Sequence, residues 1–340
     1  MTGSSDPVGL GPSSEGPILS QEAAGTSTRH PAKSRFRSVL AIRLGAASLA
    51  AAASGANGQD LEPRTYANTP VGLNFLIVGY SYLWGGVTVD PTIPLEDAKL
   101  QAHGAVFAYA RSLDVFGQSG KFDVILPTAW LSGTASFAGQ PRERDISGFA
   151  DPRFRFSVNL YGAPALTLAE FANYEQDVIV GASVQVSAPG GQYDPEKLVN
   201  LGTNHWSVKT ELGVSKRWGP VTLELAGEGT FYTDNTEFFP GHQTRSQDPI
   251  YAVQGHLIYS FGANIWGSLD GTYYAGGSTS IDGGPHRNLQ ENTRIGATLA
   301  LPISRNHSVK LYGSTGVSTR TGSNFDLVGI AWQYRFGGGL

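Results

Sequence analysis

The sequence contains no cysteine, and this absence excludes both a disulfide framework and a thiolate metal site. Beyond the N-terminal region it also lacks any run of about 18 or more apolar residues, so no helix in that part is expected to span a bilayer. An excess of basic charge is missing too, because 28 Asp and Glu residues outnumber 24 Lys and Arg residues. That charge balance argues against a nucleic-acid-binding protein, which would carry an excess of basic residues.

Motifs for catalysis and ligand binding are equally scarce. The stretch GQSGK at 117–121 resembles part of a phosphate-binding loop, but it lacks the full spacing and the Ser or Thr after lysine, so we interpret it as a turn. No G-x-S-x-G elbow occurs, and the seven histidines show no H-E-x-x-H or comparable spacing. We therefore expect no catalytic residue, no metal site and no cofactor.

The first 58 residues are typical of a targeting segment. Residues 1–30 are rich in Gly, Ser, Pro and Thr without periodicity, which indicates disorder. A basic stretch containing Arg35 and Arg43 precedes the small and apolar residues 44–53, and small residues then suit a cleavage site. A short amphipathic or buried helix is the alternative. We predict a disordered extension plus signal peptide over 1–58, which leaves 59–340 as the folded part.

The folded part alternates between apolar and polar residues in long segments separated by turn residues. Many segments reach 12 residues or more, compared with about 5–6 in soluble sheets and about 9–11 for a strand that crosses a bilayer. Segment length therefore favours an all-β, antiparallel up-and-down transmembrane barrel over 59–340. Twelve strands are predicted, near residues 72–84, 98–113, 120–134, 150–161, 176–188, 204–216, 221–234, 249–262, 264–276, 292–303, 307–319 and 325–336.

The segment 203–235 shows the pattern most clearly. Its two arms set Leu212 and Leu223 among apolar residues that alternate with polar ones, including Glu211 and Glu224. Because successive side chains leave opposite faces of a strand, one face of this hairpin is apolar and the other charged. A soluble sheet could show the same alternation, so the prediction depends on its repetition along the chain.

The connections between the predicted strands alternate in length. Short links lie at 116–120, 217–220, 262–264 and 304–306, and long polar links at 85–97, 135–148, 189–203, 235–248 and 277–291. This alternation around an even number of strands is typical of a barrel with short periplasmic turns and long extracellular loops. The exception is the long link 161–175, where Pro164 is suited to open a short helix through Phe171.

Aromatic residues gather near the predicted strand ends, as in the interface girdles of membrane barrels. They are Tyr80, Tyr82, Trp84, Trp130, Trp206, Trp218, Phe231, Tyr232, Trp266, Tyr273, Tyr274, Trp332, Tyr334 and Phe336. The competing architecture is a periplasmic sandwich or lipid-binding barrel, which would bury the apolar face and expose the charges. Strand length and loop asymmetry weigh against it.

Four segments carry a family resemblance: NLYGAPALTLAEFANY at 159–174, QDPIYAVQGHLIYSF at 247–261, WGSLDGTYYAGG at 266–277 and AWQYRFGGGL at 331–340. They resemble the bacterial meta-pathway phenol-degradation family, and the resemblance extends from about residue 60 to the end of the sequence. It implies an outer-membrane β-barrel of the transporter kind and the passage of small, including aromatic, molecules. The resemblance carries no known chemistry and establishes no substrate.

The pair His205 and Ser207 resembles the His and Ser of outer-membrane phospholipases, which must face lipid. Here both share a strand face with Lys209 and Glu211. A basic residue facing lipid costs about 2–4 kcal/mol at the midplane, so we expect this face to line the lumen or the outer rim. A membrane-embedded hydrolase is the least favoured alternative.

Charges of both signs are predicted on the inner face. The lumen-lining candidates are Arg153, Arg155, Lys209, Glu211, Glu224, Glu228, His256, Asp270, Arg294 and Lys310. Placed opposite one another, they would either select permeants or brace the wall with salt bridges, and the sequence leaves both open. Barrels of eight strands are filled by side chains, and barrels of sixteen strands enclose an open aqueous channel. We therefore expect a narrow channel in a barrel of twelve strands.

The expected function is an outer-membrane channel or transporter, without enzymatic activity, for passive or facilitated uptake of small aromatic or hydrophobic molecules. We expect a monomer that is exported through the periplasm, contacts outer-membrane lipid and a small-molecule permeant, and meets the barrel-assembly machinery during insertion. No nucleic-acid partner is expected. The alternative is a closed structural or surface-binding barrel that acts through its loops.

Overall fold

The computed structural model describes residues 61–87, 95–137, 140–320 and 323–340, so the predicted signal peptide lies outside the described residues. Within these ranges, no helix has the length and apolar content needed to cross a membrane. The described elements are β1 (Leu73–Val87), β2 (Leu95–Val115), β3 (Gln118–Phe137), β4 (Gln140–Phe149), β5 (Arg153–Tyr161), the 3-10 helix η1 (Glu170–Asn173), β6 (Val178–Ser187), β7 (Ser207–Trp218), β8 (Val221–Tyr232), β9 (Asn235–Phe238), β10 (Gln243–Gln247), β11 (Ile250–Gly262), β12 (Ile265–Gly276), β13 (Thr279–Ile281), β14 (Gln290–Pro302), β15 (His307–Thr319) and β16 (Ser323–Gly337).

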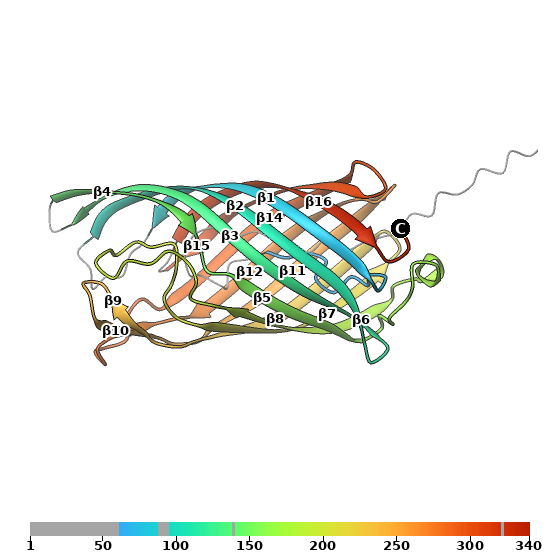
Figure 1. The fold of residues 1–340 in the computed structure, drawn as a ribbon, viewed down its shortest axis with the longest axis horizontal. Coiled ribbons are helices and arrows are strands. Elements are labelled where there is room, and N and C mark those ends of the chain that lie inside the picture. The colour runs from blue at the N-terminus through green and yellow to red at the C-terminus, as the bar shows by residue number, and fades with distance from the viewer. Residues whose placement is uncertain (1–60, 88–94, 138–139, 321–322) are drawn as a thin grey trace, which may run out of the picture. The chain divides into compact units, whose positions relative to one another are not determined.

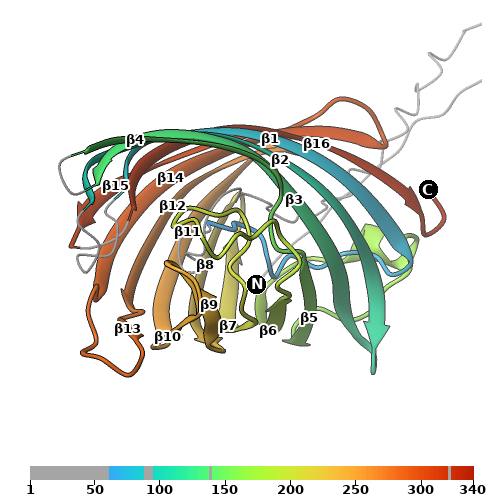
Figure 2. The same cartoon turned by 60° about the vertical axis from the view of Figure 1, so that its left-hand side comes forward.

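The long strands form one closed antiparallel barrel (Figures 1 and 2). Consecutive long strands pair with each other around the ring, β1 pairs with β16, and the pairing of β2 with β3 completes the closure. β4 and β5 both pair with β3 and share one position in the wall, so the thirteen strands of the sheet occupy twelve positions. The predicted fold class, a transmembrane barrel of twelve strands, is confirmed.

The break between β4 and β5 has a local cause in β3. Thr128 pairs with Phe149 of β4 and Ile125 pairs with Arg153 of β5, so Pro127 faces the interruption. Proline has no N–H to donate to a neighbouring strand. Because the neighbouring strand is interrupted opposite Pro127, no carbonyl oxygen there is left without a donor. The carbonyl of Pro127 still accepts a hydrogen bond from the N–H of Ala150 at 2.9 Å. A central barrel strand therefore accommodates a proline.

The outer face of the barrel is apolar, and much of the inner face is polar, although Phe75 and Ile77 of β1 and Ile125 of β3 belong to a buried apolar cluster. In β8, Leu223 and Leu225 are 36% and 48% exposed, whereas Glu224 between them is 2% exposed. The same alternation recurs in β11, where Leu257 is exposed and His256 is buried. This is the inverse of a soluble protein, and an exposed apolar band over a charged interior is what a bilayer-spanning barrel requires. The soluble sandwich would place these two sets the other way round.

The two ends of the barrel differ as predicted, with short turns at one end and long connections at the other. At the short-turn end, Phe116 and Gly117 both have positive φ, as a two-residue hairpin turn requires. At the long-loop end, β9, β10 and β13 form a separate three-stranded sheet (Figure 2).

Two of the predicted connections are wrong in detail. The link expected at 135–148 is mostly strand, because β3 and β4 continue as a hairpin whose register runs from Thr128 paired with Phe149 to Phe137 paired with Gln140. In the link 161–175, Pro164 opens no helix: it pairs with Gln118 in an isolated bridge, and helical structure is confined to η1.

The aromatic residues expected at the membrane interfaces fall into two groups. Trp130, Trp206 and Trp218 are exposed on the outer surface. Trp266 and Tyr274, however, are buried, which corrects the prediction that they belong to an outer girdle. Trp266 shares its strand face with Ser268 and Asp270, so it points into the barrel with them.

Candidate functional site: the barrel lumen

The ten predicted lumen-lining residues lie on the inner side of the wall. Nine are buried: Arg155, Lys209, Glu211, Glu224, Glu228, His256, Asp270, Arg294 and Lys310. Arg153, at the start of β5, is half-buried. Because the strands are paired in register, the residues of one face form rows around the interior, and charged side chains of neighbouring strands meet.

Two carboxylates are neighbours in the wall formed by β7 and β8. Glu211 is directly opposite Glu228, and both side chains point inward. The Nζ of Lys209 lies 3.2 Å from Glu228 Oε2, and Glu211 accepts a hydrogen bond from the hydroxyl of Tyr66. Like charges directly opposite each other are destabilising. The cation and the hydroxyl donor therefore compensate for the repulsion between the two carboxylates.

A second network joins β8, β11 and β12. His256 is in register with Glu224 on one side and with Asp270 on the other. Its Nδ1 lies 2.8 Å from Asp270 Oδ1, and Asp270 also accepts hydrogen bonds from Ser268 at 3.0 Å and Thr298 at 3.2 Å. A buried carboxylate that accepts several hydrogen bonds is held in a fixed position. This part of the wall is braced rather than free to rearrange.

Arg294 lies on β14, the strand that pairs with β12. Its guanidinium donates to the carbonyl of Phe325 at 3.0 Å and to the hydroxyl of Ser314 at 2.9 Å, and its Cζ lies 3.9 Å from the centre of the Phe325 ring. Arginine is suited to such a position because its planar group stacks on an aromatic ring and donates at its edges.

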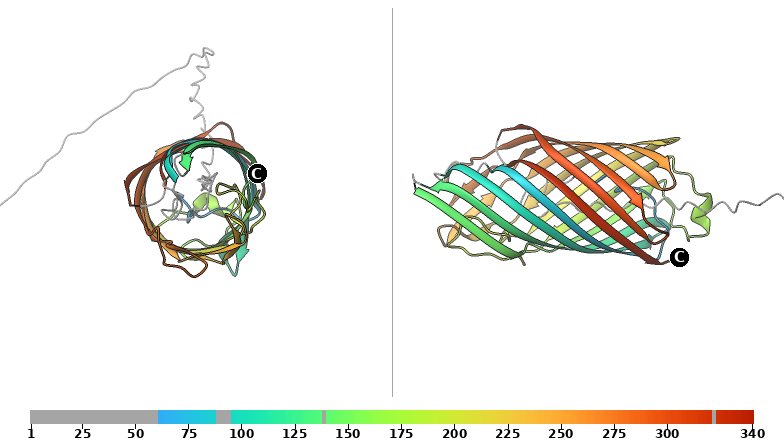
Figure 3. Two further views of the ribbon diagram at one scale, coloured as in Figure 1. Left: turned by 90° about the vertical axis from the view of Figure 1, so that its left-hand side faces the viewer. Right: turned by 90° about the horizontal axis from the view of Figure 1, so that it is seen from above.

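The sequence did not reveal that residues 61–72, named here the N-terminal segment, lie within the barrel (Figure 3, left). This segment has no strand or helix, and it contacts the inner wall and the link between β5 and β6. Glu62 forms an ion pair with Arg155 of β5, and the Nζ of Lys121 of β3 donates to the carbonyl of Thr65 at 2.9 Å. The N-terminal segment therefore fills part of the lumen.

Arg64 and Tyr66 extend these contacts around the ring. The backbone N–H of Arg64 donates to Glu224 Oε2 at 2.7 Å, and its guanidinium lies 5.1 Å from the ring centre of Trp266. Tyr66 is buried and reaches Glu211 with its hydroxyl. Together with Glu62 and Thr65, these residues connect the N-terminal segment to strands β3, β5, β7, β8 and β12.

The ring of Tyr66 lies against two glycines of the wall. Gly181 of β6 and Gly213 of β7 are directly paired across the two strands. A Cβ atom added at either position would collide with the Tyr66 ring. Ile179 and Ala226 complete the apolar surroundings of this ring. The two glycines therefore leave space on the inner wall, and the aromatic side chain of Tyr66 fills that space.

At the short-turn end, the link between β5 and β6 folds against the N-terminal segment. The N–H of Val71 donates to the carbonyl of Leu166 at 2.9 Å, and the side-chain amide of Asn68 donates to the carbonyl of Pro164 at 3.2 Å. The link is held to the β2–β3 turn by a bond from the N–H of Ala165 to the carbonyl of Gly117, at 3.0 Å. Wall, link and N-terminal segment thus form one hydrogen-bonded unit at this end.

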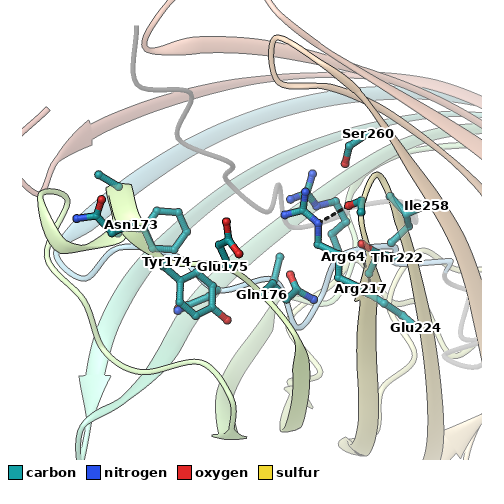
Figure 4. Close-up of a pocket in the computed structure, with 15 residues that line it drawn as sticks. Arg64, Asn173, Tyr174, Glu175, Gln176, Arg217, Thr222, Glu224, Ile258 and Ser260 are labelled. Carbon is teal, nitrogen blue, oxygen red and sulfur yellow. Dashed lines mark hydrogen bonds between the residues drawn. The ribbon is translucent and has the colours of Figure 1, made fainter. Parts of the chain in front are cut away.

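A cavity of about 580 Å³ lies between these parts (Figure 4). Arg64 and Arg217 contribute guanidinium groups to its lining, and Phe171 and Tyr174 contribute stacked aromatic rings. Burial raises the pKa of the Tyr174 hydroxyl to about 12, so this group stays protonated and donates to the carbonyl of Gly162 at 2.7 Å. The cavity is a vestibule at the short-turn end, with room for a small organic molecule.

The H-x-S pair lies where the inner face meets the long-loop end. His205 and Ser207 are both buried, whereas Trp206 between them is exposed on the outer side. The ring of His205 makes an edge contact with Tyr232, at 5.5 Å between ring centres. Both side chains therefore point away from the lipid face, where a lipid-hydrolysing site would need them. Among the described residues, no group of three or more His, Asp or Glu side chains could hold a metal ion.

The lumen residues that sequence reasoning missed include Glu62, Tyr66, Lys121 and Asp123. Lys121 and Asp123 alternate with Phe122 and so carried a usable signal, which the presence of Pro127 in the same strand obscured. Asp123 is in register with Arg155 and accepts a hydrogen bond from its Nε at 2.7 Å. Glu62 and Tyr66 lie in a stretch without periodicity and gave no signal.

Comparison with solved structures supports the same barrel fold. No curated protein matches the chain. The COG4313 outer membrane channel from Pseudomonas putida F1 has a similar fold, with a TM-score of 0.70 and 21% identity over 82% of this chain and 100% of that one. The transport unit of the autotransporter AIDA-I from Escherichia coli gives a TM-score of 0.46 and 9% identity over 78% of this chain and 90% of that one.

The family model described as "Putative MetA-pathway of phenol degradation" matches residues 78–336, which is the greater part of the sequence and nearly all of the barrel wall. The predicted family resemblance is confirmed. The match begins after the N-terminal segment and ends within β16, so it describes the strands and their connections. The chain belongs to this family of bacterial barrels.

Proposed function

We propose that the protein is an outer-membrane channel for small molecules, including aromatic ones, whose lumen is partly filled in this structure by the N-terminal segment. The observation that carries the proposal is the way this segment is held. Glu62, Thr65 and Tyr66 contact the wall through side-chain hydrogen bonds and an ion pair, and the segment adds no strand to the sheet. Such contacts can be exchanged for water or for a permeant without breaking the barrel.

The charged inner face supports the same function. Permeants that enter the lumen meet fixed charges of both signs, and lumen side chains tune selectivity in barrels. The candidates Arg153, Arg155, Lys209, Glu211, Glu224, Glu228, His256, Asp270, Arg294 and Lys310 are proposed to act in this way. None of them is proposed as a catalytic residue, and the barrel is proposed to work as a monomer.

Planar-bilayer recording of the purified barrel tests the proposal. We expect small, intermittent conductance for the wild type and larger, longer openings after deletion of residues 61–68. The substitution Tyr66→Ala, which leaves the length of the segment unchanged, should give an intermediate result. If all three proteins insert and none conducts, the barrel is no channel.

The second candidate is a closed barrel that binds partners through its loops. It is favoured by the occupied lumen and by the sheet of β9, β10 and β13, which gives the long-loop end an ordered surface. A barrel without conductance whose surface still retains a partner would support this reading. The two proposals differ in the location of the functional site, which is the barrel lumen in the first and the long-loop end in the second.

A further inference from the structure

Two guanidinium groups line the cavity at the short-turn end, one from the N-terminal segment and one from the wall (Figure 4). Arg64 belongs to the segment, and Arg217 lies near the end of β7. The Nε of Arg217 donates to the carbonyl of Gly219 at 2.8 Å, which restrains the side chain without neutralising it. Among the described residues, no ion pair includes Arg217, and the neighbouring acid Asp177 pairs with Lys216 instead. The cavity therefore presents a guanidinium that the described chain leaves without an anion.

Two carboxylates also line this cavity, and they differ in their surroundings. Glu224 is buried, and its two oxygens accept hydrogen bonds from the N–H of Arg64 at 2.7 Å and from the hydroxyl of Ser215 at 3.1 Å. Glu175, in the link between β5 and β6, is exposed to solvent. A cationic ligand would meet two guanidinium groups with an exposed carboxylate as its partner, whereas an anion is attracted by both arginines. The charge of the lining therefore favours an anion.

The same cavity offers apolar surface in addition to these charges. The rings of Phe171 and Tyr174 are stacked, with 5.4 Å between their centres, and the buried side chains of Ala67 and Ile258 also belong to the lining. The Tyr174 hydroxyl donates to the carbonyl of Gly162, so the polar end of this ring is engaged within the chain. A volume of about 580 Å³ is within the range of ~300–1,000 Å³ typical of small-molecule sites. The lining therefore suits a ligand with an anionic head and a compact apolar body.

We propose that this cavity binds a small organic carboxylate, whose head is held by Arg64 and Arg217 and whose apolar body packs against Phe171 and Tyr174. The planar guanidinium presents its N–H donors in a fork that matches the two oxygens of a carboxylate. Because Arg64 belongs to the N-terminal segment and Arg217 to the wall, the site is complete only while the segment lies in the lumen. The inference rests on the proposed channel function and adds the charge class of its permeant.

Isothermal titration calorimetry of the full barrel in a neutral maltoside detergent tests the site. The probe is cyclohexanecarboxylate near neutral pH, where its carboxyl group is ionised. Cyclohexanecarboxamide has the same ring and nearly the same shape without the charge, and acetate has the carboxylate without the ring. We expect saturable binding of cyclohexanecarboxylate, at least about tenfold tighter than binding of either analogue. An equal affinity for either analogue would overturn the proposal.

Single substitutions of charged residues locate the binding. Arg217→Gln should weaken binding of cyclohexanecarboxylate at least about tenfold, because it removes a charge-assisted hydrogen bond. Arg305→Gln is the matched control: it removes the same charge from the link between β14 and β15, outside the cavity, and should leave the affinity unchanged. Glu175→Gln removes a carboxylate that repels the ligand and should tighten binding about threefold. Equal weakening by Arg217→Gln and Arg305→Gln would indicate a nonspecific effect of charge and would also overturn the proposal.

Arg64→Gln gives a second measurement, from the side of the N-terminal segment. It keeps the backbone N–H that donates to Glu224, so the segment should stay in place while cyclohexanecarboxylate binds at least about tenfold more weakly. Heat-modifiable gel mobility checks that each variant is folded. Unchanged affinity in both Arg64→Gln and Arg217→Gln would remove the site. The calorimetric result is independent of conductance. Binding without conductance would remove the channel and keep the site, and conductance without binding would remove the site alone.

Discussion

Glu62 and Arg155 form an ion pair that joins the N-terminal segment to the barrel wall, and Arg155 keeps a second carboxylate, that of Asp123, at 2.7 Å. Removing one partner of a buried ion pair is usually costly because it leaves a charge uncompensated. Here the departure of Glu62 leaves Arg155 paired with Asp123. Arg155 therefore keeps a compensating charge when the segment leaves. We expect the free energy of releasing the segment to be lower than for an isolated buried ion pair.

The substitution Glu62→Gln should favour the open channel. It keeps the size of the side chain but removes its charge, so the segment loses a charge-assisted hydrogen bond worth about 1.5–3 kcal/mol. We expect the fraction of time spent open in single-channel recordings to rise about tenfold. Asp123→Asn is the control, because it weakens the wall rather than the segment and should lower barrel stability instead. Unchanged open times for Glu62→Gln would contradict the arrangement.

Neighbouring residues of β8 should respond in opposite ways to substitution. Leu223→Arg places a cation on the lipid face, at a cost of up to about 2–4 kcal/mol, and should reduce insertion into liposomes. Glu224→Gln keeps an acceptor for the N–H of Arg64, so it should spare folding and alter the ion selectivity of the lumen. Heat-modifiable gel mobility reports folding, and reversal potentials report selectivity. An exchange of these two outcomes would mean that the faces are inverted.

The long-loop end should loosen at acid pH because of His205. Burial lowers the pKa of this histidine, the cation Arg245 lowers it further, and Asp151 opposes them. The folded state therefore binds a proton less readily than the unfolded state, whose histidine has a pKa of about 6.5. Local stability is complete above that pH and falls as the pH decreases through 6.5 towards the folded pKa. Hydrogen exchange at 203–207 should accelerate over this range, and His205→Asn should remove the dependence.

Replacement of residues 236–247 by a short Gly-Ser linker should leave the barrel folded and conducting. This change removes most of β9 and all of β10, and it leaves β13 without its strand partner β10. The long strands are paired independently of this sheet, so their stability should be unaffected. Conductance and thermal unfolding measure the outcome. If the variant folds but loses conductance, the external sheet is part of the pathway.

Much of the wall was predictable because successive side chains of a strand alternate between its two faces. The alternation of Leu223 and Glu224 in β8 recurs in strands such as β11, and a period of two specifies both the strand and its facing. Trp266 could have been assigned to the interior by the same rule, since it shares a face with Asp270. Its assignment to a girdle relied on residue type instead of parity, and that choice was wrong.

The N-terminal segment could not be predicted for the opposite reason. Its position depends on contacts between residues far apart in sequence, such as Tyr66 with Glu211 and Arg64 with Glu224. No local pattern encodes such pairs. The glycines against which Tyr66 packs were visible, but Gly181 and Gly213 become a feature only when the register of β6 and β7 is known.

The way in which β1 begins gives the N-terminal segment a tether. The N–H of Gly72 is bound to the carbonyl of Ser112 at 3.1 Å, and the N–H of Leu73 to the hydroxyl of Ser112 at 2.9 Å, so the chain is fixed at the short-turn end. Residues 61–71 are therefore anchored at their C-terminal end. Eleven residues reach roughly 36 Å when extended, which sets an upper limit on the displacement of Leu61 from Gly72. Any movement of the segment that keeps these two bonds is confined to the residues before Gly72.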